Sequence, residues 1–500
     1  MLRLITLRPD QEDVRAKLRV ALRSHASVLA YAPTGFGKTV LAAALIKLII
    51  AAGKRVIFCV HRVDLITQTA KTFEKFGIPF SYIAAGYHYN PYHRVFIASI
   101  ATLKNRLGKI PADYVMVDEA HLSAAAGWAS VALHYAAEGA RLIGYTGSPQ
   151  RLDGKPLGDV WDTMVLGPSP RWLIEQGHLS RYRAFSPKGL DLSGLHVRGG
   201  EYVASELDDL MAGKAVLANA VKHWKKHATG KRTIGFCPSV LRAEHYAHEF
   251  RENGIRAFAL DGNTPQNIRR DAFLAIADRQ LDVIFNCRLF CEGFDLAAQI
   301  DRPVTIEAVL DNSPTQSLAN HLQKHGRGLR TDGTDVPHIL LDMVGGFAKP
   351  GLGLPDEDRE WSLDGVKKAS SEESVMICQE CFCSHEPAKQ CPDCGFVYPV
   401  KKRDAQGGGR VIGEVDGELE EIDLEAVRRE RKRQHDEEAQ QLAKDIKAGR
   451  TEDLSKDLQA QIKILLESTT AKRSKSPEKW AAHVLTARLA KKAERYGDYR

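Results

Sequence analysis

SVLAYAPTGFGKTVLAAALIKLII, residues 27–50, is the stretch that constrains the fold most strongly. A short apolar run ends at Tyr31, a glycine-rich loop occupies 32–39, and the segment from Val40 to Ile50 has the length and character of a helix. Glycine lets backbone N–H groups turn inward around phosphate oxygens, and the N-terminus of the following helix adds partial positive charge. This order of strand, loop and helix predicts a site for nucleotide phosphates.

The loop supplies the candidate ligands of the nucleotide. We expect Lys38 to reach the β- and γ-phosphates and Thr39 to ligate Mg²⁺. Ala32 stands at the first position, where the strict pattern has glycine. A chance glycine-rich turn is the alternative, but the flanking strand and helix disfavour it. The residues of the loop predicted to bind ATP are Thr34, Gly35, Gly37, Lys38 and Thr39.

Two adjacent carboxylates follow a second apolar run, from Tyr114 to Val117. Asp118 would hold Mg²⁺, and Glu119 could orient and deprotonate an attacking water. An isolated acidic pair at the end of a strand is usually a solvated turn. Together with the upstream loop, the pair predicts a site that hydrolyses ATP.

Length and composition set the scale of the molecule. A chain of 500 residues exceeds one hydrophobic core, and its 44% hydrophobic and 27% charged residues exclude a wholly disordered protein. Short apolar runs alternate with helical segments from about 26 to 150 and again from about 215 to 345. This alternation is typical of parallel sheets covered by helices on both faces. The predicted fold class is therefore α/β, with two tandem parallel-sheet domains.

Further motifs give the first half a family resemblance. The sequence DEAH at 118–121 resembles the superfamily 2 helicases of the DEAD/DEAH-box type. CVHRVDLI at 59–66 and ASIATL at 98–103 resemble their motifs Ia and Ib. LRPDQ at 7–11 resembles the adenine-reading Q motif, and TGSP at 146–149 stands at motif III with glycine in place of the usual alanine. The pattern is similar to the XPB-like group, phage-type members included.

The second half continues the resemblance. FCPS at 236–239 is similar to motif IV, and DGNT at 261–264 to the segment after it. CEGFDL at 291–296 is similar to motif V, and QKHGRGLR at 323–330 to motif VI, with an unusual lysine and histidine at its second and third positions. The resemblance covers about residues 1 to 345 and implies two RecA-like domains that form an ATP cleft.

The resemblance also assigns roles to single residues. It implies that Gln11 reads adenine and that Gly293 and Asp295 contact ATP. The residues implied to couple the ATP site to the other domain are His121, Thr146, Ser148 and Gln323. Those implied to bind nucleic acid are His61, Arg62, Ser99, Thr102, Ser239 and Thr264.

Arg327 and Arg330 are the candidates for stabilising the transition state. Hydrolysis builds charge on the γ-phosphoryl group, and an arginine from the second domain would stabilise it and tie hydrolysis to domain closure. The two residues are three apart, so a helix would present both on one face. The charge pattern alone fits a solvated basic helix equally well, and the resemblance favours the catalytic role.

Two C-x-x-C pairs form a second candidate site: Cys378, Cys381, Cys391 and Cys394. Four thiolates at this spacing fit tetrahedral Zn²⁺. Cys383 could replace Cys381, and His385 is a weaker rival. Four-cysteine sites leave no open position, so we expect a structural zinc ribbon that could also touch nucleic acid.

We expect five segments along the chain. They are a RecA-like ATP-binding domain at 1–185, a RecA-like helicase C-terminal domain at 186–350, the zinc ribbon at 370–400, a charged linker at 401–450 and a basic helical tail at 451–500. The tail, with Trp480 among its lysines and arginines, could grip phosphates or pack as an ordinary solvated helix. No apolar run spans a bilayer and the N-terminus lacks a signal peptide, so we expect a cytoplasmic protein without a membrane partner. The resemblance to phage-type helicases implies a bacterial or phage-infected cell.

These patterns predict an ATP-dependent nucleic-acid helicase that uses Mg²⁺ and Zn²⁺ and separates DNA strands. Single-stranded or forked DNA is the expected substrate, alongside replication, repair or recombination proteins. A translocase that moves on duplex DNA without unwinding and an RNA helicase are the alternatives. A nucleic-acid-binding scaffold with a degenerate ATP site is a third, against which the intact catalytic residues argue.

Overall fold

A computed structural model gives the structure of the protein. It describes residues 6–61, 63–122, 126–151, 156–186, 214–287, 289–290, 295–331, 333–349 and 351–364, with short pieces at 197–198, 201–202, 206, 376–377, 384–385, 420–422, 424 and 429. The chain divides into two compact units, Met1–Glu420 and Glu421–Arg500. The four cysteines of the expected zinc ribbon and the whole of 451–500 lie outside the described residues. Among the described helices, none has the length and apolar character needed to cross a bilayer.

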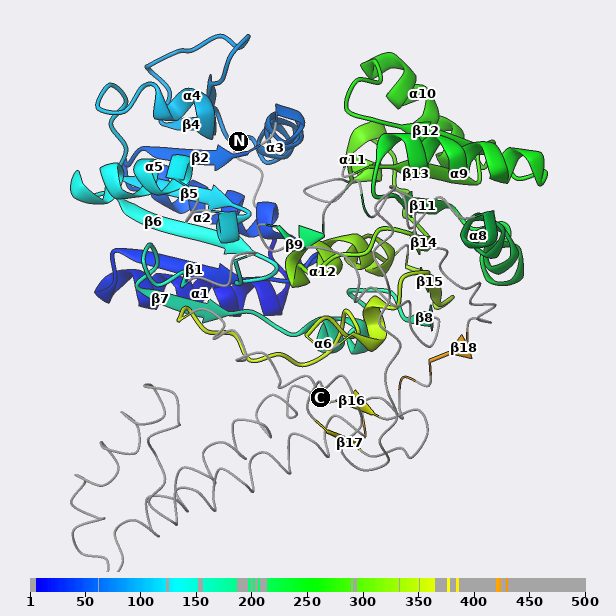
Figure 1. Cartoon of the computed structure of the whole chain (residues 1–500). Coiled ribbons are helices and arrows are strands. Elements are labelled where there is room, and N and C mark those ends of the chain that lie inside the picture. The colour runs from blue at the N-terminus through cyan, green and yellow to red at the C-terminus, as the bar shows by residue number, and fades with distance from the viewer. Residues whose placement is uncertain are drawn as a thin grey trace, which may run out of the picture. The chain divides into compact units, whose positions relative to one another are not determined.

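The first sheet contains seven parallel strands in the order β3-β4-β2-β5-β6-β1-β7 (Figure 1). Every residue of β1 and β2 is buried, as expected where helices cover both faces of a parallel sheet. The strands are β1 (Ser27–Tyr31), β2 (Val56–Val60), β3 (Ser81–Ile83), β4 (Val95–Ser99), β5 (Tyr114–Asp118), β6 (Arg141–Thr146) and β7 (Thr163–Leu166). The helices are α1 (Pro9–Ser24), α2 (Lys38–Ala51), α3 (Val63–Lys75), α4 (Ile100–Lys104) and α5 (Ala126–Ala137), with a 3-10 turn η1 (Ala120–Leu122).

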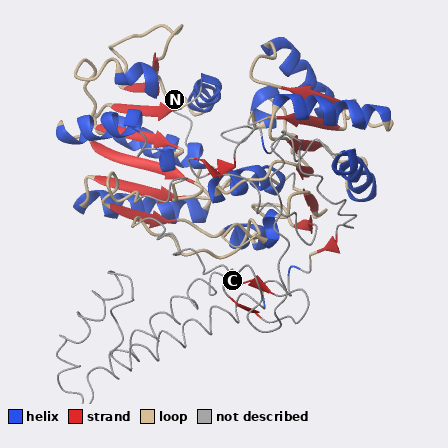
Figure 2. Ribbon diagram, viewed as in Figure 1, coloured by secondary structure: helices blue, strands red, loops and turns tan. Residues whose placement is uncertain are grey.

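The second sheet has six parallel strands in the order β12-β13-β11-β14-β15-β8, followed by β18. Helices again flank the strands (Figure 2). The strands are β8 (Tyr182–Ser186), β11 (Thr233–Phe236), β12 (Ala257–Leu260), β13 (Val283–Asn286), β14 (Ala308–Asp311), β15 (His338–Asp342) and β18 (Glu420–Glu421). The helices are α6 (Pro170–Glu175), α8 (Lys214–His227), α9 (Val240–Glu252), α10 (Gln266–Ala277), α11 (Leu296–Ile300) and α12 (Leu318–Gly326), with 3-10 turns η2 (Arg327–Leu329) and η3 (Gly346–Ala348).

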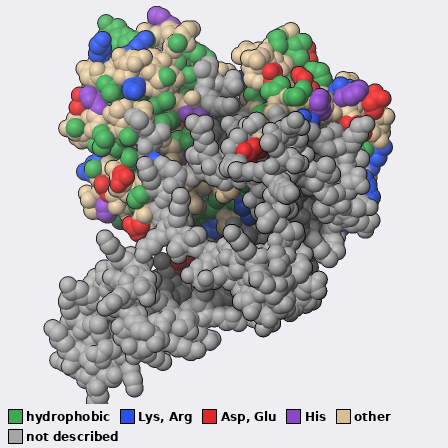
Figure 3. Space-filling view, in the orientation of Figure 1, with side chains coloured by type: hydrophobic (Ala, Val, Ile, Leu, Met, Phe, Trp, Pro, Cys, Tyr) green, Lys and Arg blue, Asp and Glu red, His purple; other side chains and the backbone are tan. Residues whose placement is uncertain are grey.

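Two short hairpins complete the described elements. One pairs β9 (Val197–Arg198) with β10 (Glu201–Tyr202), and the other pairs β16 (Met376–Ile377) with β17 (Ser384–His385). Described apolar and charged side chains intermix on the face drawn in Figure 3. A single exposed aromatic residue such as Tyr92, 91% exposed, is ordinary on a domain surface.

The prediction of two parallel α/β sheets is confirmed, but the boundary between them differs from the expected one. We expected the second domain to begin at 186, whereas β8 starts at Tyr182 and pairs with β15. The stretch between the two series of expected strands also supplies β7 at the edge of the first sheet. A short strand at a sheet edge carries little apolar periodicity, which is why the sequence did not indicate β7.

A return segment, residues 351–364, leads from the second sheet back to the first. Trp361 packs against Tyr31 with ring centroids 5.4 Å apart. The Leu363 carbonyl accepts hydrogen bonds from Leu157 N at 2.8 Å and from Gly158 N at 2.9 Å. Two links join the segment to the part of the chain that crosses in the other direction: an ion pair of Arg171 with Asp358 at 2.9 Å, and a hydrogen bond from the Tyr182 hydroxyl to Asp356.

Replacing Gly144 with alanine is expected to destabilise the first sheet. The added Cβ would lie 2.6 Å from the Trp161 ring and 2.7 Å from the Ala120 Cβ. Overpacking of this kind costs about 1–3 kcal/mol of unfolding free energy, which urea denaturation would measure. Gly127→Ala in α5 is the control, because nothing lies within 4 Å of its added Cβ and alanine favours a helix. Equal stability of the two variants would contradict this packing.

Candidate active site

The glycine-rich loop joins the carboxyl end of β1 to α2. Gly35 and Gly37 have φ values of 87° and 95°, a left-handed region that other residues occupy only with strain. The backbone N of Ala32 donates to the Thr146 carbonyl at 2.8 Å, which ties the loop to the end of β6. Lys38 Nζ lies 3.4 Å from the Ala32 carbonyl oxygen. The lysine therefore folds back over the loop that is predicted to hold phosphates.

The Q-motif segment packs directly on this loop. Gln11 is 4% exposed, and its Nε2 donates to the Phe36 carbonyl at 2.8 Å. Arg8 donates to the same carbonyl at 3.0 Å and pairs with Asp10 at 2.9 Å. The Gln11 amide and the Arg8 guanidinium therefore both hold the glycine-rich loop at Phe36. The predicted contact of Gln11 with adenine stays a prediction.

Asp118 and Glu119 lie at the carboxyl end of β5, next to the loop. Burial first, and then the neighbouring Glu119, raise the pKa of Asp118 to about 6, while Lys38 opposes this shift. A buried carboxylate with a raised pKa lacks a full counter-charge, and Mg²⁺ prefers hard oxygen donors. The Asp118 carboxylate therefore suits Mg²⁺, and the contribution of the Thr39 hydroxyl to the same ion stays a prediction.

The predicted coupling residues lie together around Glu119. His121 Nδ1 is 3.1 Å from Thr146 Oγ1 and 3.5 Å from Glu119 Oε2. Because Thr146 Oγ1 donates its proton to the Ser148 carbonyl at 3.1 Å, His121 Nδ1 carries the hydrogen in the Thr146 contact. Gln323 Nε2 donates to Glu119 Oε2 at 3.4 Å, so the second domain reaches the carboxylate expected to activate water.

Motif VI contacts the glycine-rich loop at Gly326. A Cβ on Gly326 would lie 2.9 Å from the Thr34 Cβ, closer than side chains normally pack. Arg330 pairs with Asp295 at 2.8 Å, and its Cγ lies 3.9 Å from where a Cβ on Gly35 would be. These contacts bring the predicted residues of both domains to one place.

Arg327 is 4% exposed, and its Nε donates to the Phe290 carbonyl at 3.0 Å. Arg327 and Arg330 line a cavity of about 200 Å³, together with Asp295 and Thr305. Both arginines are thus held beside open space, and Arg330 also lies near the loop at Gly35.

The residues expected to bind nucleic acid make local contacts. Ser239 accepts from Arg242 N at 3.2 Å and begins α9, and Ser99 caps α4 by accepting from Thr102 N at 3.3 Å. Thr264 Oγ1 donates to Asp261 at 2.6 Å. His61 follows β2. Arg62 and Gly293 lie outside the described residues.

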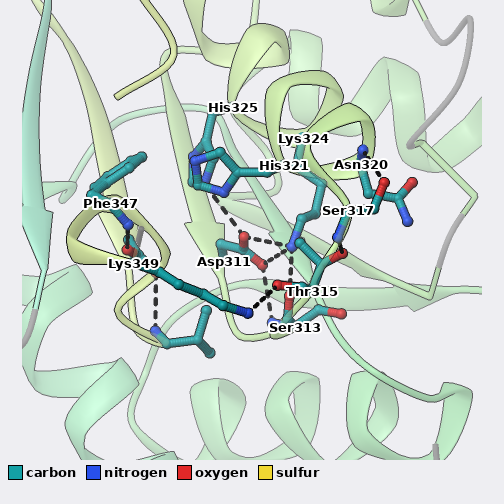
Figure 4. Close-up of polar contacts among 12 residues, drawn as sticks. Asp311, Ser313, Thr315, Ser317, Asn320, His321, Lys324, His325, Phe347 and Lys349 are labelled. Carbon is teal, nitrogen blue, oxygen red and sulfur yellow. Dashed lines mark hydrogen bonds and ion pairs between the residues drawn. The ribbon is translucent and has the colours of Figure 1, made fainter. Parts of the chain in front are cut away.

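The sequence did not indicate Asp311, whose buried carboxylate meets Lys324 and His325 of motif VI (Figure 4). Asp311, His321 and His325 are residue types that can ligate a metal ion, and their ligand atoms lie within 4.8 Å of one another. Lys324 Nζ, 2.6 Å from Asp311, already supplies the positive charge there. The unusual lysine and histidine at the second and third positions of motif VI were the sequence feature that could have indicated this cluster.

Comparisons with known proteins agree with this geometry. Residues 4–151 match the family model described as type III restriction enzyme, res subunit, and residues 214–332 match the helicase conserved C-terminal domain. A 51.5 kDa protein of a Lactococcus phage is 30% identical over 374 residues, which are 74% of this chain and 75% of that protein. The chain belongs to the superfamily 2 helicases. It is an ATP-dependent enzyme that hydrolyses ATP.

Other relatives share only part of their length with this helicase. A Saccharomyces cerevisiae protein named as an ATP-dependent helicase, IRC3, is 26% identical, and the match covers 57% of this chain and 43% of the yeast protein. A Vibrio vulnificus fragment described as an HsdR subunit of a type I restriction enzyme superimposes with a TM-score of 0.53 at 18% identity, over 68% of this chain and 65% of that one. The likeness to the Vibrio structure shows the fold alone.

Gly147→Ala in this helicase is expected to leave ATP hydrolysis within about twofold of the parent. The added Cβ would meet Lys38 Nζ and the Ala32 carbonyl at 3.5 Å, an ordinary contact. Gly35→Ala should lower the rate at least about tenfold, because φ strain costs about 1–3 kcal/mol and its Cβ would lie 2.5 Å from Leu179. Steady-state ATPase of both variants, with circular dichroism to verify folding, checks this. A similar loss in both would contradict the loop geometry.

Proposed function

We propose that this helicase hydrolyses ATP between its two α/β domains and uses the cycle to move along DNA and separate its strands. The observation that carries the proposal is the contact of Gln323 with Glu119 at 3.4 Å. A residue of motif VI touches the carboxylate expected to activate water, so hydrolysis and domain closure can be linked.

Each residue of the site has a role in this proposal. Lys38 and the loop backbone bind the phosphates, while Thr39 and Asp118 hold Mg²⁺. Glu119 orients and deprotonates the attacking water. Arg327 and Arg330 stabilise the charge that develops on the γ-phosphoryl group. Gln11 reads the adenine ring, and Gly293 and Asp295 complete the nucleotide site.

The choice of DNA rests on the comparisons. The matched family model is named for a restriction enzyme. A structure of a restriction-modification enzyme, LlaBIII, described as bound to DNA, has a TM-score of 0.50 with this chain at 14% identity and covers 71% of this chain and 28% of that one. The N-terminus of α9, capped by Ser239, offers backbone N–H groups that suit a phosphate. His61, Arg62, Ser99, Thr102 and Thr264 would hold the rest of one strand.

A structural Zn²⁺ belongs to the same proposal. The strands β16 and β17 pair with Ile377 opposite Ser384, so their ends flank the segment 378–383. That segment contains the first C-x-x-C pair, whose spacing is typical of structural zinc sites. Cys378, Cys381, Cys391 and Cys394 would bind the ion and stabilise a module too small for a core of its own.

Lys38→Ala and Glu119→Gln are each expected to lower nucleic-acid-stimulated ATPase about 100-fold or more, since one loses the phosphate ligand and the other the general base. Steady-state phosphate release at saturating ATP measures the loss. Lys17→Ala, on the exposed surface of α1 where Lys17 pairs with Asp13, is the matched control and should keep the parent rate. Full turnover in either site variant would refute the site.

The substrate is tested by steady-state ATPase with single-stranded DNA, forked duplex DNA and RNA. Salt is held fixed, because backbone binding weakens steeply as salt rises. We expect strong stimulation by DNA and little by RNA. Stimulation by RNA alone would refute the DNA assignment and leave the ATP site intact.

Strand displacement and triplex displacement then separate unwinding from movement on duplex. We expect a fork to be opened at a rate that depends on ATP. Triplex displacement without strand separation would identify a duplex translocase instead.

A further inference from the structure

Asp311 and Lys324 form an ion pair with almost no access to solvent (Figure 4). Asp311 is the last residue of β14, and Lys324 lies in the last turn of α12. Lys324 Nζ is 2.6 Å from Asp311 Oδ2 and 2.8 Å from Oδ1, and the side chains are 3% and 1% exposed. A buried pair adds little stability over apolar residues of similar size. Because Lys324 belongs to motif VI, the pair points to a role in positioning that motif.

Further contacts hold the side chains of Asp311 and Lys324 in place. Ser313 N donates to Asp311 Oδ1 at 3.0 Å, and Lys324 Nζ also donates to the Ser313 carbonyl. His325 Nε2 lies 3.4 Å from Asp311 Oδ2. Burial would raise the pKa of Asp311, but Lys324 and His325 together hold it well below its usual range. The carboxylate therefore stays ionised at physiological pH.

The neighbouring residues of α12 face the ATP site. Successive residues of a helix point about 100° apart, so the side chain of Gln323 leaves the helix in a different direction from that of Lys324. Gln323 contacts Glu119, and Gly326 lies against Thr34. On another side of the helix, His321 Nε2 donates to the Gly353 carbonyl at 2.8 Å. Rotation of α12 about its axis would break these contacts together.

We propose that Asp311 and Lys324 are positioning residues that fix the rotation of α12, so that Gln323 meets Glu119 and the arginines of motif VI face the γ-phosphoryl group. This inference rests on the proposed role of Arg327 and Arg330. Neither Asp311 nor Lys324 touches substrate. Their effect passes through the helix and the 3-10 turn that begins at Arg327.

The test compares nucleotide affinities in Lys324→Met, Lys324→Arg and the neutral double variant Asp311→Asn/Lys324→Met. Affinity for Mg²⁺–ADP with aluminium fluoride, which resembles the transition state, is divided by affinity for Mg²⁺–ADP alone. This ratio, together with kcat and KM for ATP, reports placement of the arginines. Thermal unfolding reports stability. The double variant leaves no unpaired buried charge, so it provides a folded protein if the single variant does not fold.

Glu307→Gln is the matched control. Glu307 immediately precedes β14, at the opposite end from Asp311, and forms a half-buried pair with Arg232 at 3.1 Å. Loss of this pair should lower the unfolding temperature and leave the affinity ratio unchanged. Arg327→Ala is measured in parallel to test the arginine role itself.

We expect Lys324→Met and the double variant to lose about tenfold or more in both kcat and the ratio, with KM within about threefold, as for an interaction made only in the transition state. Lys324→Arg should recover most of the ratio. An unchanged ratio in the double variant, beside a loss in Arg327→Ala, would overturn the inference and leave the proposed function standing. A ratio unchanged in Arg327→Ala would overturn the arginine role and the inference with it.

Discussion

The close approach of Gly326 to Thr34 is the constraint on which the arrangement of the site depends. A side chain at 326 would lie within 3 Å of the threonine, so motif VI can meet the loop only because it carries glycine there. Once this contact forms, Gln323 reaches Glu119 at one end of the motif, and Arg330 comes to lie beside Gly35 at the other. One missing Cβ thus sets the distance between the two halves of the ATP site.

Much of the fold follows from the sequence. The apolar run 27–31 matches β1 residue for residue, and the run from Tyr114 to Val117 matches β5 to within one residue. These strands are central or fully buried, where the apolar signal is strong because both faces are covered. The strands β3 and β7, at the two edges of the first sheet, were not indicated. Strands of three or four residues at an edge have too little buried surface to leave a pattern. The strands β8 and β14 of the second sheet were also missed, although both are mostly or fully buried.

Some residues of the site were likewise indicated by the sequence, and others were not. Motif spacing indicated the residues that now surround Glu119, because such motifs reflect chemistry that requires fixed residue types. The sequence did not indicate Asp311, since β14 was not predicted and a lone aspartate carries no local signal. Likewise, the grip of Arg8 on the Phe36 carbonyl at 3.0 Å depends on an approach between segments 28 residues apart. Pairings of this kind are properties of the tertiary fold.

The return segment has a mechanical consequence. The chain crosses from the first sheet to the second near Arg171, and recrosses near Asp358, and these two crossings are bonded to each other. Any motion that separates the two α/β domains at this point must break the Arg171–Asp358 pair or displace both crossings together.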